Sequence, residues 1–387
     1  MHNNPATRSF NVMLKPTGAE CNLACEYCYY LDKKDLYPGG SFAMSDSLLE
    51  AFTRQYIESQ PGPDIQFAWQ GGEPTLAGLD FYRRALALQE KYRKPGMRIL
   101  NAIQTNGTRL DPHWCSLFKQ HNFLVGISLD GPQEIHDQYR QDKAGKSSFT
   151  RVMRGLNLLK EHAVEFNILA CISAANIEHP LETYRFLRDR VKAQYIQFIP
   201  ILEYSSDGSI EPYAISAEQY GRFMISVFDE WVRRDVGTVF VQLFDTTLAN
   251  QVGAPGGLCV FQKTCGLALI LEHNGDLYSC DHYVDSAHLL GNILEIPLAQ
   301  LVRSQRQTAF GQDKFDHLPP DCRECELLRY CWGGCPKHRT AFTQNGMPDL
   351  NHFCEGQKAF FKHVQEPMQT MASLLSRRLP PSRIMHR

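Results

Sequence analysis

The chain has 387 residues, with 40 Lys and Arg against 42 Asp and Glu and a formal net charge of −2. Such a length favours two or three domains, and the balanced charge gives no reason to expect nucleic acid or a membrane surface as a partner. No stretch approaches the roughly 20 apolar residues of a membrane-spanning helix, and the N-terminus is unlike a secretory signal. We therefore expect a cytoplasmic protein.

Short apolar runs alternate with helical patterns between residues 11 and 202. This alternation is typical of βαβ units that form a parallel sheet. Six units are too few for a closed eight-stranded barrel, so we predict an open, partial (β/α)6 barrel. The predicted strands are NVMLKPT, IQFAWQ, ILNAIQT, FLVGISL, ILACISA and YIQFIPI, and the predicted helices cover 46–59, 79–92, 111–121, 149–163 and 180–191.

The rest of the chain differs in composition. After a predicted helix at 217–234, the segment GAPGG at 253–257 leads into a cysteine-rich module. Residues 267–280 favour a β-hairpin with Asn274 and Gly275 at its turn, and a helical stretch begins after about 356. We expect a first domain at 1–240, a small cysteine-rich domain at 241–375 and a frayed basic tail at 376–387.

Thirteen cysteines are many for a chain that is expected to stay reduced. Clustered cysteines in such a chain bind metal more often than they form disulfides. Three lie between 21 and 28 and eight between 259 and 354, whereas Cys115 and Cys171 stand apart in segments that pattern as core. The grouped cysteines are therefore the candidate metal ligands.

The first group, Cys21-x3-Cys25-x2-Cys28, directly follows the first predicted strand. Three thiolates of one short loop hold three irons of a four-iron cluster and leave the fourth iron open to another ligand. A structural zinc site is the alternative, but it needs four ligands. The spacing resembles the defining motif of the radical S-adenosylmethionine superfamily, in which the methionyl group of the cofactor chelates the open iron.

This resemblance assigns further residues. Gly71-Gly72-Glu73-Pro74, after the second strand, resembles the superfamily's GGEP-like motif, which meets the methionyl amine. Ligands in parallel barrels contact the C-terminal ends of strands, so Gln70, Gln104 and Asn106 are expected to face the same site. For the polar residues, loop capping or a surface ion pair is the alternative role. The resemblance implies the cofactor-binding residues Tyr27, Gly72, Glu73, Ser128, Arg140 and Leu202.

The C-terminal cysteines follow the pattern Cys265-x9-Gly-x4-Cys280, then Cys322-x2-Cys325-x5-Cys331-x3-Cys335, and finally Cys354. This pattern resembles the SPASM module, which binds two auxiliary four-iron clusters in radical enzymes that modify peptides and proteins. Cys259 completes eight ligands, enough for two thiolate-held clusters, although a pair of zinc sites is the alternative. The resemblance assigns Cys259, Cys265, Cys280 and Cys335 to the first auxiliary cluster, and Cys322, Cys325, Cys331 and Cys354 to the second.

Five further segments of the sequence are informative: KPTGAECNLACEYCYY, WQGGEPTL, QTNGT, SLDGP and CWGGCPKHR. Through these segments the chain resembles, over nearly its whole length, the anaerobic sulfatase-maturating enzymes. Enzymes of this family oxidise one Cys or Ser of a sulfatase to Cα-formylglycine, and the sequence leaves open which of the two is the target here.

The family resemblance also implies a catalytic residue, cofactors and partners. Asp281, directly after the hairpin cysteine, would be the base. The cofactors would be S-adenosylmethionine and three [4Fe–4S] clusters. An unfolded or nascent sulfatase polypeptide would be the substrate, and a flavodoxin or ferredoxin would donate electrons.

Two other functions stay open. The chain could be another SPASM peptide maturase that forms a thioether or carbon–carbon crosslink. It could also be a non-enzymatic iron–sulfur or zinc scaffold, for which the GGEP motif would be unneeded.

Overall fold

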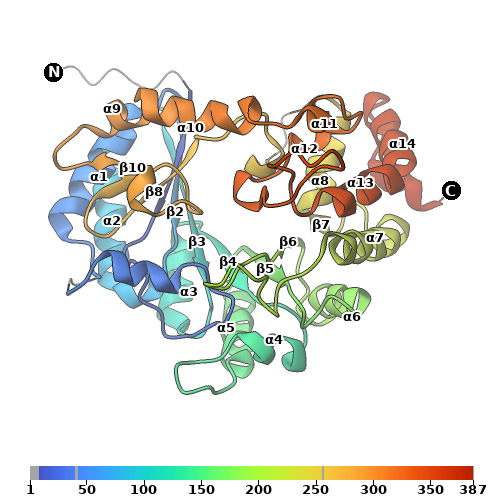
Figure 1. The fold of residues 1–387 in the computed structure, drawn as a ribbon. Helices are drawn as coiled ribbons and strands as arrows, with labels where there is room; N and C mark the ends of the chain where they lie inside the picture. Colours follow the sequence, from blue (N-terminus) through green and yellow to red (C-terminus); the bar gives the residue numbers. More distant parts are fainter. Residues whose placement is uncertain (1–7, 40–41, 255–256, 387) are drawn as a thin grey trace. The chain divides into compact units, whose positions relative to one another are not determined.

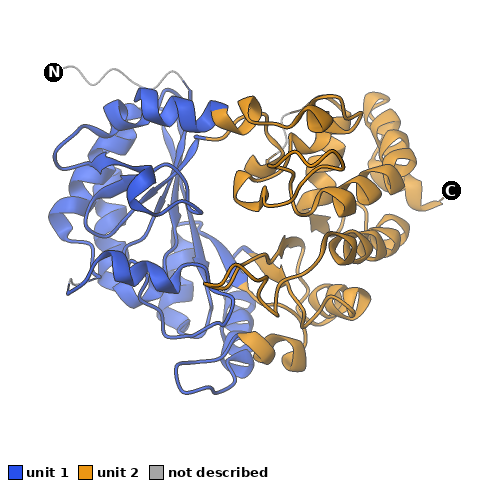
Figure 2. Ribbon diagram, in the orientation of Figure 1, with its two compact units in different colours: residues 1–127, 140–166, 266–312 blue, residues 128–139, 167–265, 313–387 orange. Residues whose placement is uncertain are grey.

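The computed structural model describes residues 8–39, 42–254 and 257–386. The chain divides into two compact units, each assembled from separate stretches of sequence (Figure 2). Unit 1 comprises Met1–Ile127, Arg140–Phe166 and Gly266–Gln312, and unit 2 comprises Ser128–Tyr139, Asn167–Cys265 and Asp313–Arg387. Both units therefore take segments from each of the two domains that we expect from the sequence.

Unit 1 is built on a mostly parallel sheet with the strand order β10-β9-β8-β1-β2-β3-β4. Strands β1 to β4 run parallel, as predicted from their apolar runs. The predicted hairpin also forms, and its first strand adds to β1 in parallel, with Asn11 opposite Ala268. The bounds are β1 Asn11–Leu14, β2 Asp64–Trp69, β3 Arg98–Thr105, β4 Leu124–Ser128, β8 Ala268–Leu271, β9 Asp276–Tyr278 and β10 Leu289–Asn292.

Helices accompany this sheet in unit 1 (Figure 1). Ser45 caps α1 by accepting a hydrogen bond from the amide of Leu48, and aromatic side chains of α1 and β2 form a core in which Phe52 stacks on Tyr56 at 5.1 Å. The α-helices are α1 Asp46–Ser59, α2 Leu79–Tyr92, α3 Pro112–Gln120, α5 Phe149–Glu161, α9 Leu298–Val302 and α10 Gln305–Asp316, of which the last four residues belong to unit 2. Short 3-10 segments are η1 Leu31–Leu36, η2 Pro74–Ala77 and η5 Ser286–His288.

Unit 2 contains three parallel strands in the order β5-β6-β7. They are β5 Phe166–Ile172, β6 Tyr195–Pro200 and β7 Phe240–Val241. The α-helices are α4 Gln133–Tyr139, α6 Pro180–Arg185, α7 Ala217–Arg234, α8 Gln242–Gln251, α11 Pro320–Arg323, α12 Leu328–Cys331, α13 Cys354–His363 and α14 Gln365–Ser376. The shorter segments are η3 Phe186–Arg190, which is a π-helix, and the 3-10 segments η4 Cys259–Phe261, η6 Pro336–His338 and η7 Pro381–His386.

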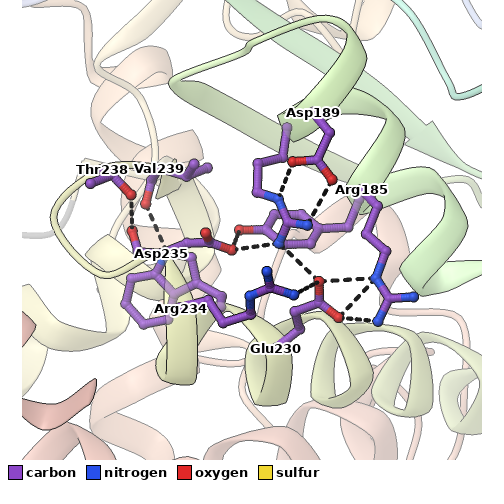
Figure 3. Close-up of polar contacts among 10 residues, drawn as sticks. Arg185, Asp189, Glu230, Arg234, Asp235, Thr238 and Val239 are labelled. Atoms are coloured by element: carbon purple, nitrogen blue, oxygen red, sulfur yellow. Dashed lines mark hydrogen bonds and ion pairs between the residues drawn. The ribbon is translucent and has the colours of Figure 1, made fainter. Parts of the chain in front are cut away.

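An ion-pair network joins the end of α6 and the π-helical segment to α7 (Figure 3). Glu230 accepts hydrogen bonds from Arg185 at 3.0 Å and from Arg188 at 2.8 Å. Arg188 also donates to Asp235 at 2.9 Å, and its guanidinium contacts the exposed carboxylate of Asp189. The network fixes the segment between β5 and β6 against the longest helix of the unit.

The six predicted strands and the open, mostly parallel α/β architecture are confirmed. The expectation of a frayed C-terminal tail is wrong, because η7 lies against α14 and α7. Pro380 and Pro381 restrict the backbone there and start the 3-10 turn. No helix within the described ranges is both long and apolar enough to cross a membrane.

Candidate functional site

The first cysteine group lies in the loop that follows β1. Hydrogen-bond donors surround its sulfur atoms: the amide of Leu23 lies 3.4 Å and the Asn106 side chain 3.8 Å from the Cys21 sulfur, and Arg140 lies 4.0 Å from the Cys25 sulfur. Burial, together with the charges of Glu73 and the other two cysteines, raises the pKa of Cys21 to about 12 despite the Leu23 hydrogen bond. This loop therefore presents three adjacent sulfurs, and a metal that binds Cys21 has to displace the proton that the raised pKa retains.

The GGEP segment is joined to the cysteine loop through its backbone. The amide of Gly72 donates to the Gly18 carbonyl, and the amide of Glu73 donates to the Glu20 carbonyl, both at 2.8 Å. A Cβ atom on Gly72 would lie 2.1 Å from the Glu20 carbonyl oxygen, so only glycine fits at this position. The close approach of these two loops is the local reason for the glycine pair.

Glu73 is fully buried beneath this junction. Its Oε1 accepts hydrogen bonds from the Thr75 amide and hydroxyl and from the Thr105 hydroxyl, and its Oε2 accepts one from the Asn106 amide at 2.8 Å. Burial raises the pKa of this carboxyl group, and the four hydrogen bonds oppose that rise. Among the described residues Oε2 accepts one hydrogen bond, from the Asn106 amide, so it retains the capacity to accept another donor, such as the predicted cofactor amine.

A charged cluster lies at the C-terminal ends of β1 and β2. The buried ammonium of Lys15 lies 2.8 Å from Asp281 Oδ1, 3.0 Å from Gln70 Oε1 and 3.9 Å from the centre of the Tyr30 ring. Tyr29 donates a hydrogen bond to Asp281 Oδ2. Burial alone would raise the pKa of Asp281, but Lys15, His282 and these hydrogen bonds hold it below its usual value. The predicted base is therefore half-buried, and its lowered pKa favours the carboxylate form.

Lys15, Tyr29 and Tyr30 complete this cluster, and the sequence reasoning did not assign them. Lys15 interrupts the apolar run NVMLKPT, and a cation within a predicted strand could have indicated a functional side chain. The ring of Tyr30 belongs to a buried hydrophobic cluster with Ile270 and Tyr278 of the hairpin. The hairpin pairing to β1 is what brings Asp281 to Lys15.

The remaining predicted cofactor contacts fall into two sets. Tyr27 and Arg140 lie in unit 1, where the Arg140 guanidinium stands 5.3 Å from the centre of the Tyr27 ring, beside Cys25. Ser128, at the end of β4, and the buried Leu202, after β6, belong to unit 2. Their contact with the cofactor stays a prediction.

The cysteines assigned to the second auxiliary cluster line one cavity in unit 2. Cys322 comes from α11, Cys331 from the end of α12 and Cys354 from the start of α13, with Cys325 in the connection between the two short helices. Burial is the main cause that raises the pKa of Cys322 to about 11 and that of Cys354 to about 12. The four cysteines that the SPASM resemblance assigns to the second auxiliary cluster thus share one cavity, and their role as its ligands stays a prediction.

Three of the cysteines assigned to the first auxiliary cluster also form a group. Cys259, Cys265 and Cys335 lie close enough to interact electrostatically, all within unit 2. Cys280 belongs to unit 1, where it follows β9 and interacts with Tyr29. Its place among the ligands of the first auxiliary cluster therefore remains an inference from the sequence pattern.

These groupings fit iron–sulfur clusters by the chemistry of their donors. The first loop supplies three thiols and the second cavity four, as an open and a closed four-iron site require. In the described residues, no three or more His, Cys, Asp or Glu side chains are arranged as ligands of a single metal ion. Cys115 and Cys171, predicted to be core, are both buried.

Sequence comparison identifies the same two modules. Residues 16–187 match the radical SAM superfamily, and residues 263–326 match an iron-sulfur cluster-binding domain of the SPASM type. Together with the cysteine loop and the GGEP junction, these matches define a radical S-adenosylmethionine enzyme with auxiliary iron–sulfur clusters.

Relatives along the whole chain specify the family. The chain is 46% identical to a serine-type anaerobic sulfatase-maturating enzyme of Bacteroides thetaiotaomicron, over 98% of this chain and 95% of the relative. It is 32% identical to a cysteine-type enzyme of Clostridium perfringens, over 92% and 96%. The solved structure of anSMEcpe with bound AdoMet and Cp18Cys peptide matches with a TM-score of 0.85 and 30% identity, covering 94% of this chain and 99% of that one. The chain belongs to the anaerobic sulfatase-maturating enzymes.

Membership confirms the predicted class of activity and the predicted cofactors. The chain is an oxidoreductase that makes formylglycine, and it uses S-adenosylmethionine and three [4Fe–4S] clusters. A crosslinking maturase and a non-enzymatic scaffold are thereby set aside.

Proposed function

We propose that this enzyme oxidises a serine of a sulfatase polypeptide to Cα-formylglycine, with Asp281 as the base. The preference for serine is supported by the higher identity to a serine-type relative, 46%, than to a cysteine-type relative, 32%. The role of Asp281 is supported by its contact at 2.8 Å with the buried ammonium of Lys15, which stabilises the carboxylate form of this half-buried side chain.

The chain's own residues bind the cofactor, orient the base and accept a proton from the substrate. When bound, the cofactors supply the radical and electron-transfer chemistry. The carboxylate of Asp281 accepts the hydroxyl proton of the target serine, which makes removal of the electron left at its Cβ easier. Lys15 keeps Asp281 ionised before the reaction, and Tyr29 and Lys15 fix its two oxygen atoms. The backbone of the GGEP junction and Glu73 hold the methionyl end of the cofactor.

The substrate is an extended or unfolded segment, because a folded sulfatase core would hide its target. The anSMEcpe structure with a bound peptide supports this choice. A flavodoxin or ferredoxin is the proposed electron donor. The cytoplasm is the proposed location, since eleven grouped cysteines have to stay reduced to ligate iron.

A matched pair of sulfatase-derived peptides that differ only in Ser or Cys at the target tests the proposal. Each peptide is incubated anaerobically with enzyme, S-adenosylmethionine and a reductant, and the products are read by mass spectrometry. We expect the Ser peptide to lose two hydrogen atoms, with a higher kcat/KM than the Cys peptide. Modification of the Cys peptide alone would contradict the serine assignment.

A further inference from the structure

Lys314, near the end of α10, is a buried lysine beside the auxiliary-cluster cysteines. It is 1% exposed, and its ammonium donates hydrogen bonds to the carbonyls of Cys259 at 3.0 Å and Val260 at 2.9 Å. It interacts electrostatically with Cys259, Cys265 and Cys335, which are assigned to the first auxiliary cluster. It also interacts with Cys331, which is assigned to the second. Lys314 therefore acts on both groups of cysteines within unit 2.

Arg339 occupies a similar position on a different segment. The guanidinium is half-buried and donates to the carbonyls of Gly333 at 3.1 Å and Trp332 at 3.2 Å. Its electrostatic partners include Cys265 and Cys335 of the first auxiliary group, Cys322 of the second, and the carboxylate of Asp349. Two cations that are distant in sequence thus act on both groups of cysteines.

The electrostatic partners of Lys314 show what compensates its charge. Burial lowers the pKa of Lys314, and Cys265, Cys259 and Cys335 oppose this by favouring its charged form. A buried cation without an opposite charge is costly to the fold. A four-iron cluster held by four thiolates carries net negative charge, so a loaded cluster would compensate Lys314 and partly compensate Arg339.

We propose that Lys314 and Arg339 tune the auxiliary clusters, raising their reduction potentials so that each accepts one electron more readily. Reduction adds one negative charge to a cluster, and a fixed cation nearby stabilises that charge. Net charge and hydrogen bonding around the sulfurs are the levers that set the potentials of such clusters. The benefit to catalysis rests on the proposed function, in which substrate oxidation releases one electron toward these clusters.

Redox titration of the anaerobic holoenzyme, followed by electron paramagnetic resonance without peptide, tests this proposal. Lys314→Met removes the charge and keeps the length of the side chain, and Lys314→Arg keeps the charge. We expect Lys314→Met to lower the reduction potential of the first auxiliary cluster by about 59 mV. This shift corresponds to a tenfold change in the one-electron reduction equilibrium. Lys314→Arg should restore most of this loss, and Arg339→Met should lower the potentials of both clusters.

Lys362→Met is the matched control, because this exposed lysine of α13 pairs with Glu326 at 3.2 Å. The reduction potentials of the auxiliary clusters in this variant should equal those of the unmodified enzyme. Unchanged potentials in Lys314→Met and Arg339→Met with full iron content would overturn the proposal. Loss of iron from both Met variants and from Lys314→Arg would assign the cations to folding and would also overturn it. Since no peptide is present, failure of the serine proposal leaves this measurement unaffected.

Discussion

The carboxylate of Asp281 depends on its neighbours for its charge. Its side chain is 18% exposed, and burial by itself would favour the protonated form. Lys15 is the main cause that reverses that preference, because its buried ammonium lies 2.8 Å from the carboxylate, and His282 adds to the effect. The residue is therefore able to accept a proton without first losing one to water.

Asp281→Asn tests whether this carboxylate accepts the proton. The amide is nearly isosteric, so iron content and cofactor binding should be kept, whereas formylglycine production should fall by roughly 10²- to 10⁴-fold if general-base catalysis has its usual worth. Cofactor cleavage should fall less, so that 5′-deoxyadenosine exceeds formylglycine. Both products are measured in one anaerobic assay, and full coupling at a normal rate would remove Asp281 from the mechanism.

Sequence patterns predicted the residues whose chemistry depends on local spacing. The three cysteines of the first loop and the glycine pair could be predicted from the sequence, because their partners lie within a few residues or at a strand end. The contact of Lys15 with Asp281 was not readable, because it depends on the pairing of β8 with β1. Such pairing leaves no local signal in either segment.

At the scale of elements, the loop after β2 approaches the backbone of the cysteine loop closely. Gly72→Ala should disrupt this approach, because the new Cβ would lie 2.1 Å from the Glu20 carbonyl oxygen. We expect the variant to lose iron from the first cluster and the ability to cleave S-adenosylmethionine. Gly62→Ala, just before β2, is the control, since its Cβ would meet only the Ser9 hydroxyl at 3.7 Å. Normal iron content in Gly72→Ala would contradict the assigned geometry.

The ion-pair network of α7 predicts a pH-dependent stability. Hydrogen bonds from Arg185 are the main cause that lowers the pKa of Glu230 below its ordinary 4.5. Burial opposes this lowering, and hydrogen bonds from Arg188 add to it. A carboxyl group with a depressed folded-state pKa contributes its stabilisation above the unfolded pKa, and the stabilisation is lost as pH falls below 4.5 toward the folded value.

Glu230→Gln should therefore lower the melting temperature at pH 7, by the equivalent of about 2 kcal/mol for hydrogen bonds to a charged group. The difference from the unmodified enzyme should shrink as pH falls below the ordinary pKa of 4.5. Asp189→Asn is the control, because this carboxylate is 53% exposed and a solvent-exposed ion pair adds little. A difference in melting temperature that does not change with pH would show that the charge of Glu230 is not the stabilising feature.

The sequence predicted the long, periodic elements well and the short, irregular ones poorly. The helix expected at 180–191 ends as an α-helix at Arg185 and continues as a π-helical turn, which a periodicity of 3.6 residues does not reveal. Strand β7 has only two residues, too few for an alternating pattern. Between Cys331 and Cys335, Gly333 and Gly334 adopt φ values of +72° and +64°, and this conformation explains the glycine pair there.

For the whole molecule, eleven cysteines in three assigned sets predict the metal content. Anaerobically purified enzyme should carry about twelve irons per chain, four for each cluster. Replacing Cys21, Cys25 and Cys28 together by Ala should remove about one third of this iron and abolish cofactor cleavage. Replacing Cys322 and Cys325 should remove a similar share and leave some uncoupled cleavage. Stoichiometric zinc with little iron would contradict all three assignments.

The most direct test of the account follows the hydrogen atom from the substrate. A sulfatase peptide that carries deuterium at Cβ of the target serine is incubated anaerobically with enzyme, S-adenosylmethionine and reductant, and both products are analysed by mass spectrometry. We expect formylglycine in the peptide and one deuterium in an equal amount of 5′-deoxyadenosine. Unlabelled 5′-deoxyadenosine with an unmodified peptide, in an enzyme with all its iron, would contradict this expectation.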